Sequence, residues 1–411
     1  MIYGNPFILQ VIYTINGEMM PLENLETYFS KKSAKEFSVE DLFNNRNKLH
    51  GWICQAATMK YGALYIDEVN SKPTEQFILA TPKMHYPHDQ NGIFSWKKGI
   101  KSFDTYEKYD GTNIFQYGYK DAVGNQFYTY KTRRRPVLEP GGAFSLYELW
   151  EEVLDIHPEI PEYPFKNEMN ISYEMYGRKN VVMVRYPELI DAKIIFGRDE
   201  LGRIWSPKEL TCSPIGHAKL ITEIREFSDM REEYDKIRKY LEGRIKVTER
   251  EGDQDLVEGM EGAIMYGVTD SGCVQYKAKP QYIMDIHIKQ AMGIPIHSIM
   301  TTVRNAFEEV DIVTFDLVVE LLKEEFTEEM IYKKTGAIKR TIDDMNLYMK
   351  LRKLIVEEYD QMNKDDKSFD INLDKGKVMR HFATRMKDWN LDRKASSKIF
   401  GIIINNYGVQ P

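Results

Sequence analysis

Cysteine is scarce in this sequence, and long apolar runs are absent. The three cysteines, Cys54, Cys212 and Cys273, are far apart and form no Cys-x-x-Cys pair. This spacing argues against a zinc ribbon or a disulfide framework. No apolar stretch reaches about 18 residues, the length that spans a bilayer. The first residues also lack a basic segment followed by an apolar run and a cleavage site. These absences predict a protein of the reducing cytoplasm with no membrane association.

Excess positive charge is also missing. The 411 residues carry a formal net charge of −7, with 42% hydrophobic and 29% charged residues, as in a globular protein. This balance excludes a general nucleic-acid coat protein, so any polynucleotide must be held by a local basic surface. The length allows one large hydrophobic core or two to three ordinary ones.

The sequence pattern divides the chain into parts, of which the first two contain most of the strands. Residues 1–80 alternate strand-like segments with a helix that Ser38 would cap. They predict an α+β segment that is either a separate unit or part of the main core. Residues 81–285 contain short alternating strands between Gly, Asn and Asp turns, with acidic helices near 145–155 and 228–241. That mixture predicts antiparallel sheets with peripheral helices, not a doubly wound parallel sheet.

Apolar residues recur at helical spacing in the last part of the chain. One such segment begins at Thr341, where Asp344 would complete a capping box. We therefore expect an all-helical C-terminal domain over residues 286–411. The fold class predicted for the whole chain is α+β, with an antiparallel-sheet domain followed by this helical domain.

Five short motifs follow one another in the middle of the chain. In order, they are Lys108-Tyr109-Asp110-Gly111-Thr112-Asn113, Tyr130-Lys131-Thr132-Arg133, Tyr173-Glu174-Met175-Tyr176-Gly177, Glu261-Gly262-Ala263-Ile264-Met265 and Tyr276-Lys277-Ala278-Lys279. A lone Lys-x-Asp-Gly match arises by chance in roughly one chain in ten of this length, as a surface lysine in an ordinary turn. The ordered set is more specific. A reactive lysine, two glutamates and a closing lysine pair can activate an amine, hold a metal-bound nucleotide and neutralise a phosphate.

This ordered set resembles the covalent nucleotidyltransferase superfamily of RNA ligases, DNA ligases and mRNA capping enzymes. It is most similar to the ATP-dependent RNA ligases of phage and archaeal type, over about residues 79–280. The stretch from Glu107 to Asn113 reproduces the pattern Glu-Lys-x-x-Gly-Thr-Asn that is frequent in those RNA ligases. DNA ligases and capping enzymes usually continue into an OB-type barrel, whereas residues 286–411 have a helical pattern. The resemblance therefore favours an RNA ligase.

The resemblance implies that Lys108 is the nucleophile, which displaces pyrophosphate from ATP and becomes lysyl-AMP. An amine attacks phosphorus only when it is unprotonated, and a free lysine has a pKa of about 10.4. We expect Lys277, Lys279 and bound magnesium to lower the pKa of Lys108, because neighbouring cations disfavour the ammonium form. The two lysines alternate on one strand face, so both can point at the α-phosphate. Asp110 and Gly111 match the turn after the nucleophile, where glycine lets the backbone approach the phosphate.

Three further positions near the nucleophile are implied to contact the nucleotide. By resemblance, Glu107 lies near the nucleotide and Asn113 near the α-phosphate. Arg133 corresponds to an arginine placed against the ribose or the incoming 5′-phosphate. Arg134 and Arg135 follow it directly, so the register of this motif stays open by one or two positions.

The resemblance assigns the glutamates and one aromatic residue as well. It places Glu174 on the ribose side of the nucleotide and Glu261 at the metal. Glu258 offers a competing Glu-Gly pair, but Glu261 is followed by the apolar run that the family pattern requires. Phe196 occupies the place of the aromatic residue that stacks on adenine. Gly197 follows it here, where relatives have an acidic residue.

The function implied is an ATP-dependent RNA ligase. It would adenylylate its lysine, transfer AMP to an RNA 5′-phosphate and join that end to a 3′-hydroxyl, using ATP and Mg²⁺, with Mn²⁺ as a substitute. The alternatives are a DNA ligase, a GTP-dependent capping guanylyltransferase, and a non-catalytic RNA-binding protein with a nucleotide pocket. Residues 361–400 carry ten Lys or Arg against six Asp, a local net charge of +4. That stretch is a solvated helix face, the interpretation we favour, or an RNA contact.

Overall fold

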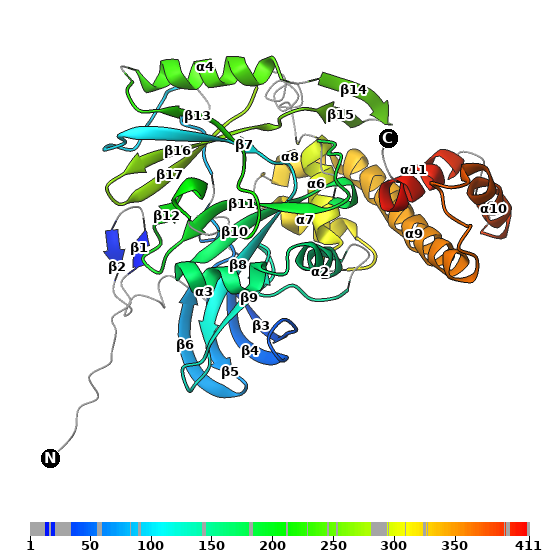
Figure 1. Ribbon diagram of the computed structural model, residues 1–411, viewed down its shortest axis with the longest axis horizontal. Helices are drawn as coiled ribbons and strands as arrows, with labels where there is room; N and C mark the ends of the chain where they lie inside the picture. Colours follow the sequence, from blue (N-terminus) through cyan, green and yellow to red (C-terminus); the bar gives the residue numbers. More distant parts are fainter. Residues whose placement is uncertain are drawn as a thin grey trace.

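The computed structural model describes most of the chain, and a nine-stranded antiparallel sheet lies at its centre (Figure 1). A four-stranded sheet lies on one side of the central sheet, and helices form the C-terminal part. The residues that the structure describes are 13–15, 18–20, 34–55, 60–82, 84–88, 92–141, 145–180, 184–210, 213–227, 229–244, 246–251, 254–280, 294, 296–308, 310–323, 326, 328–389, 391 and 395–408.

The central sheet has the strand order β13-β7-β16-β17-β12-β11-β10-β8-β9. Its strands are β7 (Ser102–Lys108), β8 (Thr112–Lys120), β9 (Gln126–Lys131), β10 (Asn170–Tyr176), β11 (Asp191–Arg198), β12 (Ile204–Trp205), β13 (Leu220–Ile224), β16 (Gly262–Thr269) and β17 (Gly272–Ala278). Every pair of neighbours is antiparallel. Separate two-stranded hairpins are formed by β1 (Tyr13–Ile15) with β2 (Glu18–Met20), and by β14 (Lys246–Glu251) with β15 (Gln254–Glu258). The prediction of antiparallel sheets is confirmed.

The helix expected at Ser38 is wrong, because that segment is a strand. Ser38 lies in β3 (Ala34–Asp41) and pairs with His50 of β4 (Asn47–Cys54). Phe37 and Asp41 are its buried residues, a spacing that suits one face of either a strand or a helix. The hydrogen-bonded pairing with β4 makes this segment a strand. Strands β3 and β4 form the four-stranded N-terminal sheet together with β5 (Leu64–Val69) and β6 (Lys72–Ile78).

The N-terminal sheet is part of the main core. Its buried residues share one hydrophobic cluster with the central sheet, in which Leu49 and Ile66 belong to the first sheet and Tyr117 to the second. Buried Asp41 also joins the two sheets. Its carboxylate accepts hydrogen bonds from the Tyr119 hydroxyl at 2.7 Å and from the Thr129 hydroxyl at 2.8 Å.

The two acidic helices are confirmed at α2 (Leu146–Ile156) and α4 (Met230–Glu242). Ser145 and Asp229 cap them by accepting hydrogen bonds from backbone N–H groups of the first turn. Helix α4 covers the outer face of β16 and β17 (Figure 1), where Tyr234 and Leu241 pack in a cluster with Phe103. The described residues also include the short helix α3 (Tyr163–Asn167) and the 3-10 turns η3 (Ile160–Glu162), η4 (Arg178–Asn180) and η5 (Pro207–Glu209).

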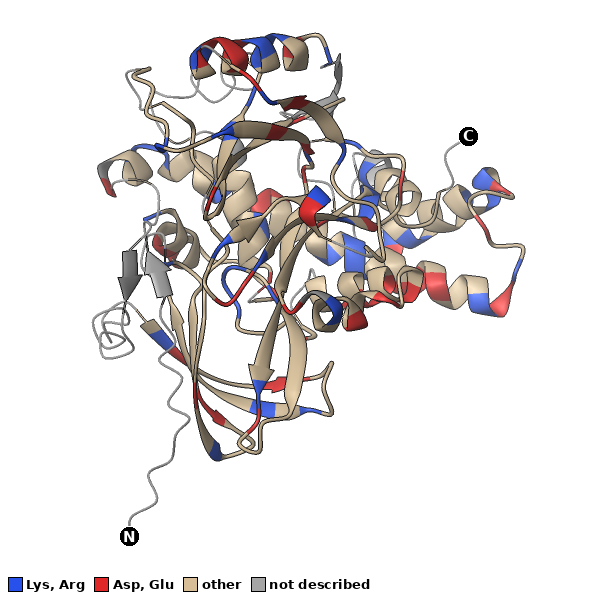
Figure 2. Cartoon of the chain, turned by 60° about the vertical axis from the view of Figure 1, so that its left-hand side comes forward, with Lys and Arg blue, Asp and Glu red and all other residues tan. Residues whose placement is uncertain are grey.

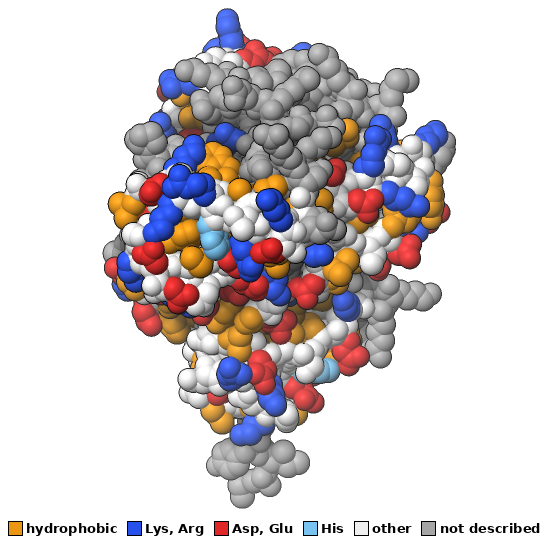
Figure 3. Space-filling view, turned by 90° about the vertical axis from the view of Figure 1, so that its right-hand side faces the viewer, with side chains coloured by type: hydrophobic (Ala, Val, Ile, Leu, Met, Phe, Trp, Pro, Cys, Tyr) orange, Lys and Arg blue, Asp and Glu red, His pale blue; other side chains and the backbone are white. Residues whose placement is uncertain are grey.

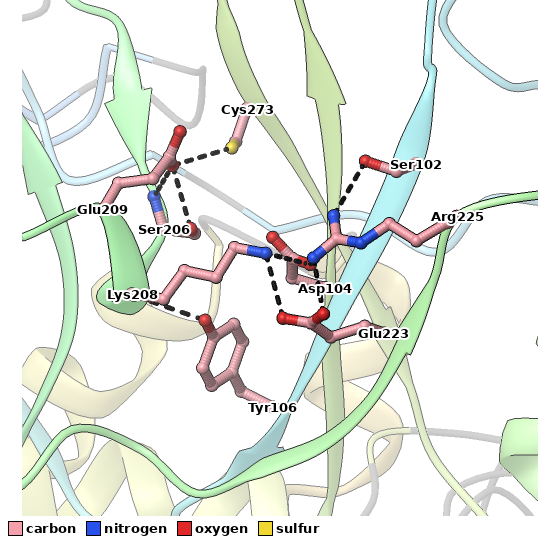
Figure 4. A network of polar contacts seen from close by, with 9 residues as sticks. All are labelled: Ser102, Asp104, Tyr106, Ser206, Lys208, Glu209, Glu223, Arg225 and Cys273. Carbon is pink, nitrogen blue, oxygen red and sulfur yellow. Dashed lines mark hydrogen bonds and ion pairs between the residues drawn. The ribbon is translucent and has the colours of Figure 1, made fainter.

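A network of charged side chains fixes the edge strand β13 and the η5 turn to β7 (Figure 4). Asp104 of β7 is fully buried. Its carboxylate lies 2.6 Å from the Lys208 ammonium and 3.3 Å from the Arg225 guanidinium. Both cations also pair with Glu223 of β13. The charges cancel within the network, so we assign it a structural role.

The C-terminal part is helical, as predicted. Its helices are α6 (Ile296–Ala306), α7 (Phe315–Leu322), α8 (Glu328–Lys333), α9 (Thr335–Asp365), α10 (Lys375–Asp388) and α11 (Ala395–Tyr407). The capping pattern predicted that a helix begins at Thr341. Thr341 lies instead inside α9. Its hydroxyl donates to the carbonyl oxygen of Ala337, four residues earlier. No helix in the described part of the chain is long and apolar enough to cross a membrane.

These helices belong to two different hydrophobic cores. Helices α6 and α7 and the first half of α9 share a core with the central sheet, as shown by Val303, Val318 and Ile342 in one cluster with Tyr173. The second half of α9 packs with α10 and α11 in a separate cluster. We call residues 351–408 the distal helical module. A division of the chain at residue 286 therefore does not coincide with a boundary between cores.

Basic and acidic side chains are interspersed on the distal helical module (Figures 2 and 3). In α10, Lys377 pairs with Asp366, and Arg385 lies 3.0 Å from Asp388 and 2.9 Å from Glu358. Several cations of the stretch 361–400 are thus neutralised by neighbours. This pairing is what a solvated helix face requires, and an RNA contact there stays a prediction.

Candidate active site

Lys108 lies where the chain passes from one half of the central sheet to the other. It is the last residue of β7, and β8 begins four residues later. In the sheet, however, β16, β17, β12, β11 and β10 lie between these two strands. Residues 109–111 therefore connect the two halves. Glu261 and the closing lysine pair are on the β7 half, and Glu174 is on the β8 half.

Glu261 binds two lysines at once. One carboxylate oxygen accepts from the Nζ atom of Lys108, and the other lies 2.7 Å from the Nζ atom of Lys279. The Glu261 side chain is only 5% exposed. Burial acts to raise its pKa, but the charges and hydrogen bonds of Lys108 and Lys279 outweigh burial and lower the pKa to about 2. The structure thus joins the first, fourth and fifth motifs in one buried ion-paired cluster.

Strand register places the reactive groups on one face of the sheet. Gly262 of β16 lies opposite Lys108, and Ile264 lies opposite Lys277 of β17. Cross-strand partners share a face, and so do residues two apart. Lys108 and Lys277 therefore share a face. Gly262 is needed between them, because an added Cβ atom would lie 2.5 Å from the carbonyl oxygen of Ala278.

Glu174 brings a second carboxylate to the nucleophile from the other half of the sheet. One of its oxygens accepts a hydrogen bond from the backbone N–H of Gly111 at 3.2 Å. Burial raises the pKa of Glu174 to about 7; the charge of Lys108 opposes this rise, and the charges of Glu261 and Asp110 add to it. A carboxylate with this pKa is only partly ionised at neutral pH.

The carboxylates around Lys108 act against the expected lowering of its pKa, which stays a prediction because it includes the charge of bound magnesium. Burial does act to lower it, but the carboxylates of Glu261, Glu174 and Asp110 outweigh burial and raise the pKa well above its usual range. The closing lysines do not reverse this, because Lys279 is itself paired with Glu261. The ammonium form of Lys108 is therefore favoured.

The turn after Lys108 is held tightly against neighbouring backbone. Asp110 is 6% exposed, and its carboxylate accepts from the N–H of Val184 at 2.7 Å. Its own N–H donates to the Tyr186 hydroxyl at 2.8 Å. At Gly111 an added Cβ atom would lie 2.0 Å from the carbonyl oxygen of Met175. Glycine is needed here because the backbone of β10 lies so close. This reason adds to the one predicted from the sequence, in which glycine lets the backbone approach the phosphate.

Glu107 and Asn113 lie on either side of this turn, with different surroundings. Glu107 precedes Lys108 in β7, so its side chain points to the opposite face of the strand. The Asn113 amide donates to the Ser172 hydroxyl at 2.8 Å and to the Tyr173 carbonyl at 3.1 Å. The Asn113 side chain thus joins β8 to β10. Its predicted contact with the α-phosphate stays a prediction.

Residues 81–82 and 84–88, which precede Lys108 in the chain, contact both halves of the central sheet. Arg133 donates to the backbone carbonyls of residues 81–82, at 3.1 and 3.4 Å. Further on, the His85 carbonyl accepts from the N–H of Lys277 at 2.9 Å. The ring of Tyr86 then lies 4.5 Å from the Lys277 ammonium, a cation–π contact. No sequence motif predicted Tyr86, because only this pairing with β17 brings it to the site.

Phe196 lies on the same face of the sheet as Glu174. It pairs with Ser172, which is two residues before Glu174 in β10. The Phe196 side chain is 2% exposed and contacts Phe115, with ring centroids 6.4 Å apart. This position permits the stacking role that the resemblance implies, which stays a prediction.

The carboxylates of the site suit a magnesium ion that arrives with a nucleotide. Magnesium is usually held by one or two carboxylates together with substrate phosphates, and not by a full protein cage. Glu261 and Glu174 are two such carboxylates, close enough to influence each other's ionisation. Among the described residues no group of three or more His, Cys, Asp or Glu side chains could hold a metal ion alone. The donor set therefore fits a nucleotide-bound magnesium.

The chain is similar to solved structures of RNA ligases. Two structures of an archaeal ATP-dependent RNA ligase have 14% and 15% sequence identity and a TM-score of 0.43, and cover 81% and 82% of this chain and 78% and 80% of their own. A mutant Naegleria gruberi RNA ligase with ATP and Mn has 12% identity and a TM-score of 0.32, covering 46% of this chain and 52% of its own. No family model and no curated protein sequence matches the chain.

Proposed function

We propose that this protein is an ATP-dependent RNA ligase that acts through a lysyl-AMP intermediate. The observation that carries the proposal is the ion-paired cluster of Lys108, Glu261 and Lys279, which unites residues from three motifs. Glu174 lies next to this cluster on the other half of the sheet. The order of the motifs and the cluster that they form support a covalent nucleotidyltransferase.

In the first step, Lys108 must lose its proton and attack the α-phosphorus of ATP. A nitrogen–phosphorus bond forms, the bond to the β-phosphate breaks, and pyrophosphate leaves. Glu261 would hold the magnesium that accompanies ATP, and that ion supplies positive charge next to the phosphates. A Glu261 carboxylate that holds a metal ion would stabilise the ammonium form of Lys108 less. Lys277 and Lys279 then neutralise the phosphate charge, a dominant factor in phosphoryl transfer.

In the later steps, AMP passes from Lys108 to an RNA 5′-phosphate, and a 3′-hydroxyl displaces AMP to form the phosphodiester. RNA is the proposed substrate because the stretch from Glu107 to Asn113 follows the RNA-ligase pattern. The helices α6 to α11 also occupy the place where DNA ligases and capping enzymes usually have a barrel.

The test is covalent labelling of the protein with ATP that carries a label on its α-phosphate, in the presence of magnesium. We expect a labelled wild-type chain and an unlabelled Lys108→Ala variant of normal stability, because no other side chain can form this phosphoramidate. Labelled protein should then join RNA with 5′-phosphate and 3′-hydroxyl ends. Labelling of Lys108→Ala would overturn the assignment of the nucleophile.

Parallel assays separate the other functions. Labelling by GTP that equals labelling by ATP would indicate a capping guanylyltransferase, and preferential sealing of DNA would indicate a DNA ligase. Binding of RNA without any labelling would indicate a non-catalytic RNA-binding protein. Replacing magnesium by manganese should preserve labelling, since both ions prefer oxygen ligands in octahedral geometry.

A further inference from the structure

A buried asparagine supports the turn that follows Lys108. Asn180, the last residue of η4, has no exposed surface. Its amide donates to the carbonyl oxygen of Met175 at 2.6 Å, and its side-chain oxygen accepts from the Thr112 hydroxyl at 3.2 Å. Met175 is also the residue whose carbonyl oxygen lies against Gly111. Asn180 thus fixes β8 and β10 at the point where the turn meets them.

Arg304 reaches this asparagine from the C-terminal helices. It lies in α6, and its guanidinium Nη2 donates to the side-chain oxygen of Asn180. Helix α6 is itself fixed on the central sheet, because Ile299, Val303 and Ala306 are fully buried in the shared core. The guanidinium is therefore carried by a well-packed element and not by a mobile loop.

The charge of Arg304 is matched by a carboxylate of the turn. Burial lowers the pKa of Arg304 to about 10, and the charges of Asp110 and Glu308 oppose this shift. Asp110 is buried too, with 6% of its surface exposed. Burying one of these charges alone would be costly, because an unpaired ion loses its hydration. Each charge makes the burial of the other possible.

We propose that Arg304 is a positioning residue for adenylylation, which holds the turn after Lys108 through Asn180. The inference rests on the proposed function. It gives the C-terminal helices a part in the first chemical step, in addition to any contact with RNA.

The role predicts a specific kinetic change. A nucleophile that is displaced by even 1 Å loses about 10²-fold in rate, since reaction requires close and aligned atoms. Arg304 acts on the turn through Asn180, which it contacts directly. Its loss should therefore lower the rate of lysyl-AMP formation at saturating ATP by at least about tenfold. The ATP concentration that gives half of the maximal rate should change by less than about twofold, because ATP binding is preserved.

The experiment measures this rate in the full-length chain carrying Arg304→Gln or Arg304→Lys. The lysine variant keeps the charge near Asp110 and should recover part of the rate. Val303→Ala is the control for packing, because it removes buried methyl groups from the same helix without touching Asn180. Lys339→Gln is the control for charge, because it removes an exposed cation from α9. Both controls should label at nearly the wild-type rate per folded molecule, with folding checked by thermal unfolding.

A double-mutant cycle with Asn180→Ala completes the test. If Arg304 acts through Asn180, the combined variant should be little slower than the slower single variant. Wild-type labelling rates in Arg304→Gln, or equal losses in Arg304→Gln and Val303→Ala at matched stability, would overturn the inference. If Arg304→Gln does not fold, the same comparison of Arg304→Lys with Val303→Ala decides. A wild-type chain that is never labelled would instead defeat the proposed function.

Discussion

Glu261 forms an ion pair with Lys108 although 153 positions separate the two residues in the sequence. This pair favours the ammonium form of the proposed nucleophile, since the carboxylates around it raise the pKa of Lys108. The same carboxylate is the proposed ligand of the magnesium that accompanies ATP. Under the proposed function, binding of magnesium and ATP at Glu261 would therefore favour activation of Lys108.

Glu261→Gln should slow lysine adenylylation by at least about tenfold, equivalent to roughly 1.4 kcal/mol of transition-state stabilisation. The amide keeps the shape of the side chain but removes the charge that Lys108 and Lys279 share. Labelling rates at saturating ATP and magnesium measure the effect. Glu258→Gln, which changes the competing glutamate at the end of β15, is the matched control. If Glu258→Gln proves the slower variant, the fourth motif has been assigned to the wrong residue.

Gly111→Ala should abolish labelling or unfold the site, because its Cβ atom would lie 2.0 Å from the carbonyl oxygen of Met175. Gly401→Ala is a control of opposite sign. An added Cβ atom there meets nothing within 4 Å, and alanine stabilises a helix interior by about 1 kcal/mol relative to glycine. Thermal unfolding should show a lower midpoint for the first variant and a higher one for the second. A Gly111→Ala protein with wild-type stability and labelling would contradict this view of the turn.

Lys131→Met should remove a pH dependence of stability. Lys131 is fully buried, and its Nζ atom donates to the carbonyl oxygens of Gly62 at 2.9 Å and Thr132 at 2.6 Å. Burial, with a smaller effect of the Arg133 charge, lowers its pKa to about 7. An unfolded lysine has a pKa of about 10.4. Between these values the unfolded chain binds the extra proton, so the free energy of unfolding rises with pH, by up to about 1.4 kcal/mol per unit.

Denaturant unfolding between pH 7 and 10 would measure that slope, because this range lies between the folded and unfolded pKa values of Lys131. Other groups also titrate there, so the informative quantity is the difference in slope between wild type and Lys131→Met. Lys120→Met, which changes an exposed lysine at the end of β8, should leave the slope unchanged. An equal slope in wild type and Lys131→Met would show that the buried lysine stays charged.

Removal of residues 351–411 should spare lysine adenylylation and impair sealing or alter which RNA ends are joined. The cut lies between the two hydrophobic cores, so the shared core with α6 and α7 is kept. Removal of residues 286–411 should instead give insoluble or unlabelled protein, because it exposes that shared core and removes Arg304. Labelling and sealing assays at two salt concentrations compare the two proteins. Sealing of every substrate at the wild-type rate by the shorter deletion would exclude the distal helical module from substrate recognition.

The amino-acid sequence alone was enough to predict the broad class of the fold and to propose the candidate site residues. Local patterns are enough to predict the helices at 145–155 and 228–241, because these features depend on neighbours in the chain. They also predict helices in the last part of the chain. The prediction of a reactive lysine depended on the order of all five motifs and on the resemblance that this order carries. Local pattern failed at Ser38, where a spacing shared by helix and strand was decided by pairing with β4.

Only the tertiary structure decided which of these residues meet. The pairing of β16 with β7 and β17 is non-local, and it brings Glu261 to Lys108 and Tyr86 to Lys277. The fold also brings to Lys108 the carboxylates that raise its pKa, which matters because a pKa depends on charges close in space and not in sequence. Arg304 carries no signal in its own segment. Its contact with Asn180 follows from the packing of α6 on the central sheet, a non-local arrangement that no pattern in its own segment predicts.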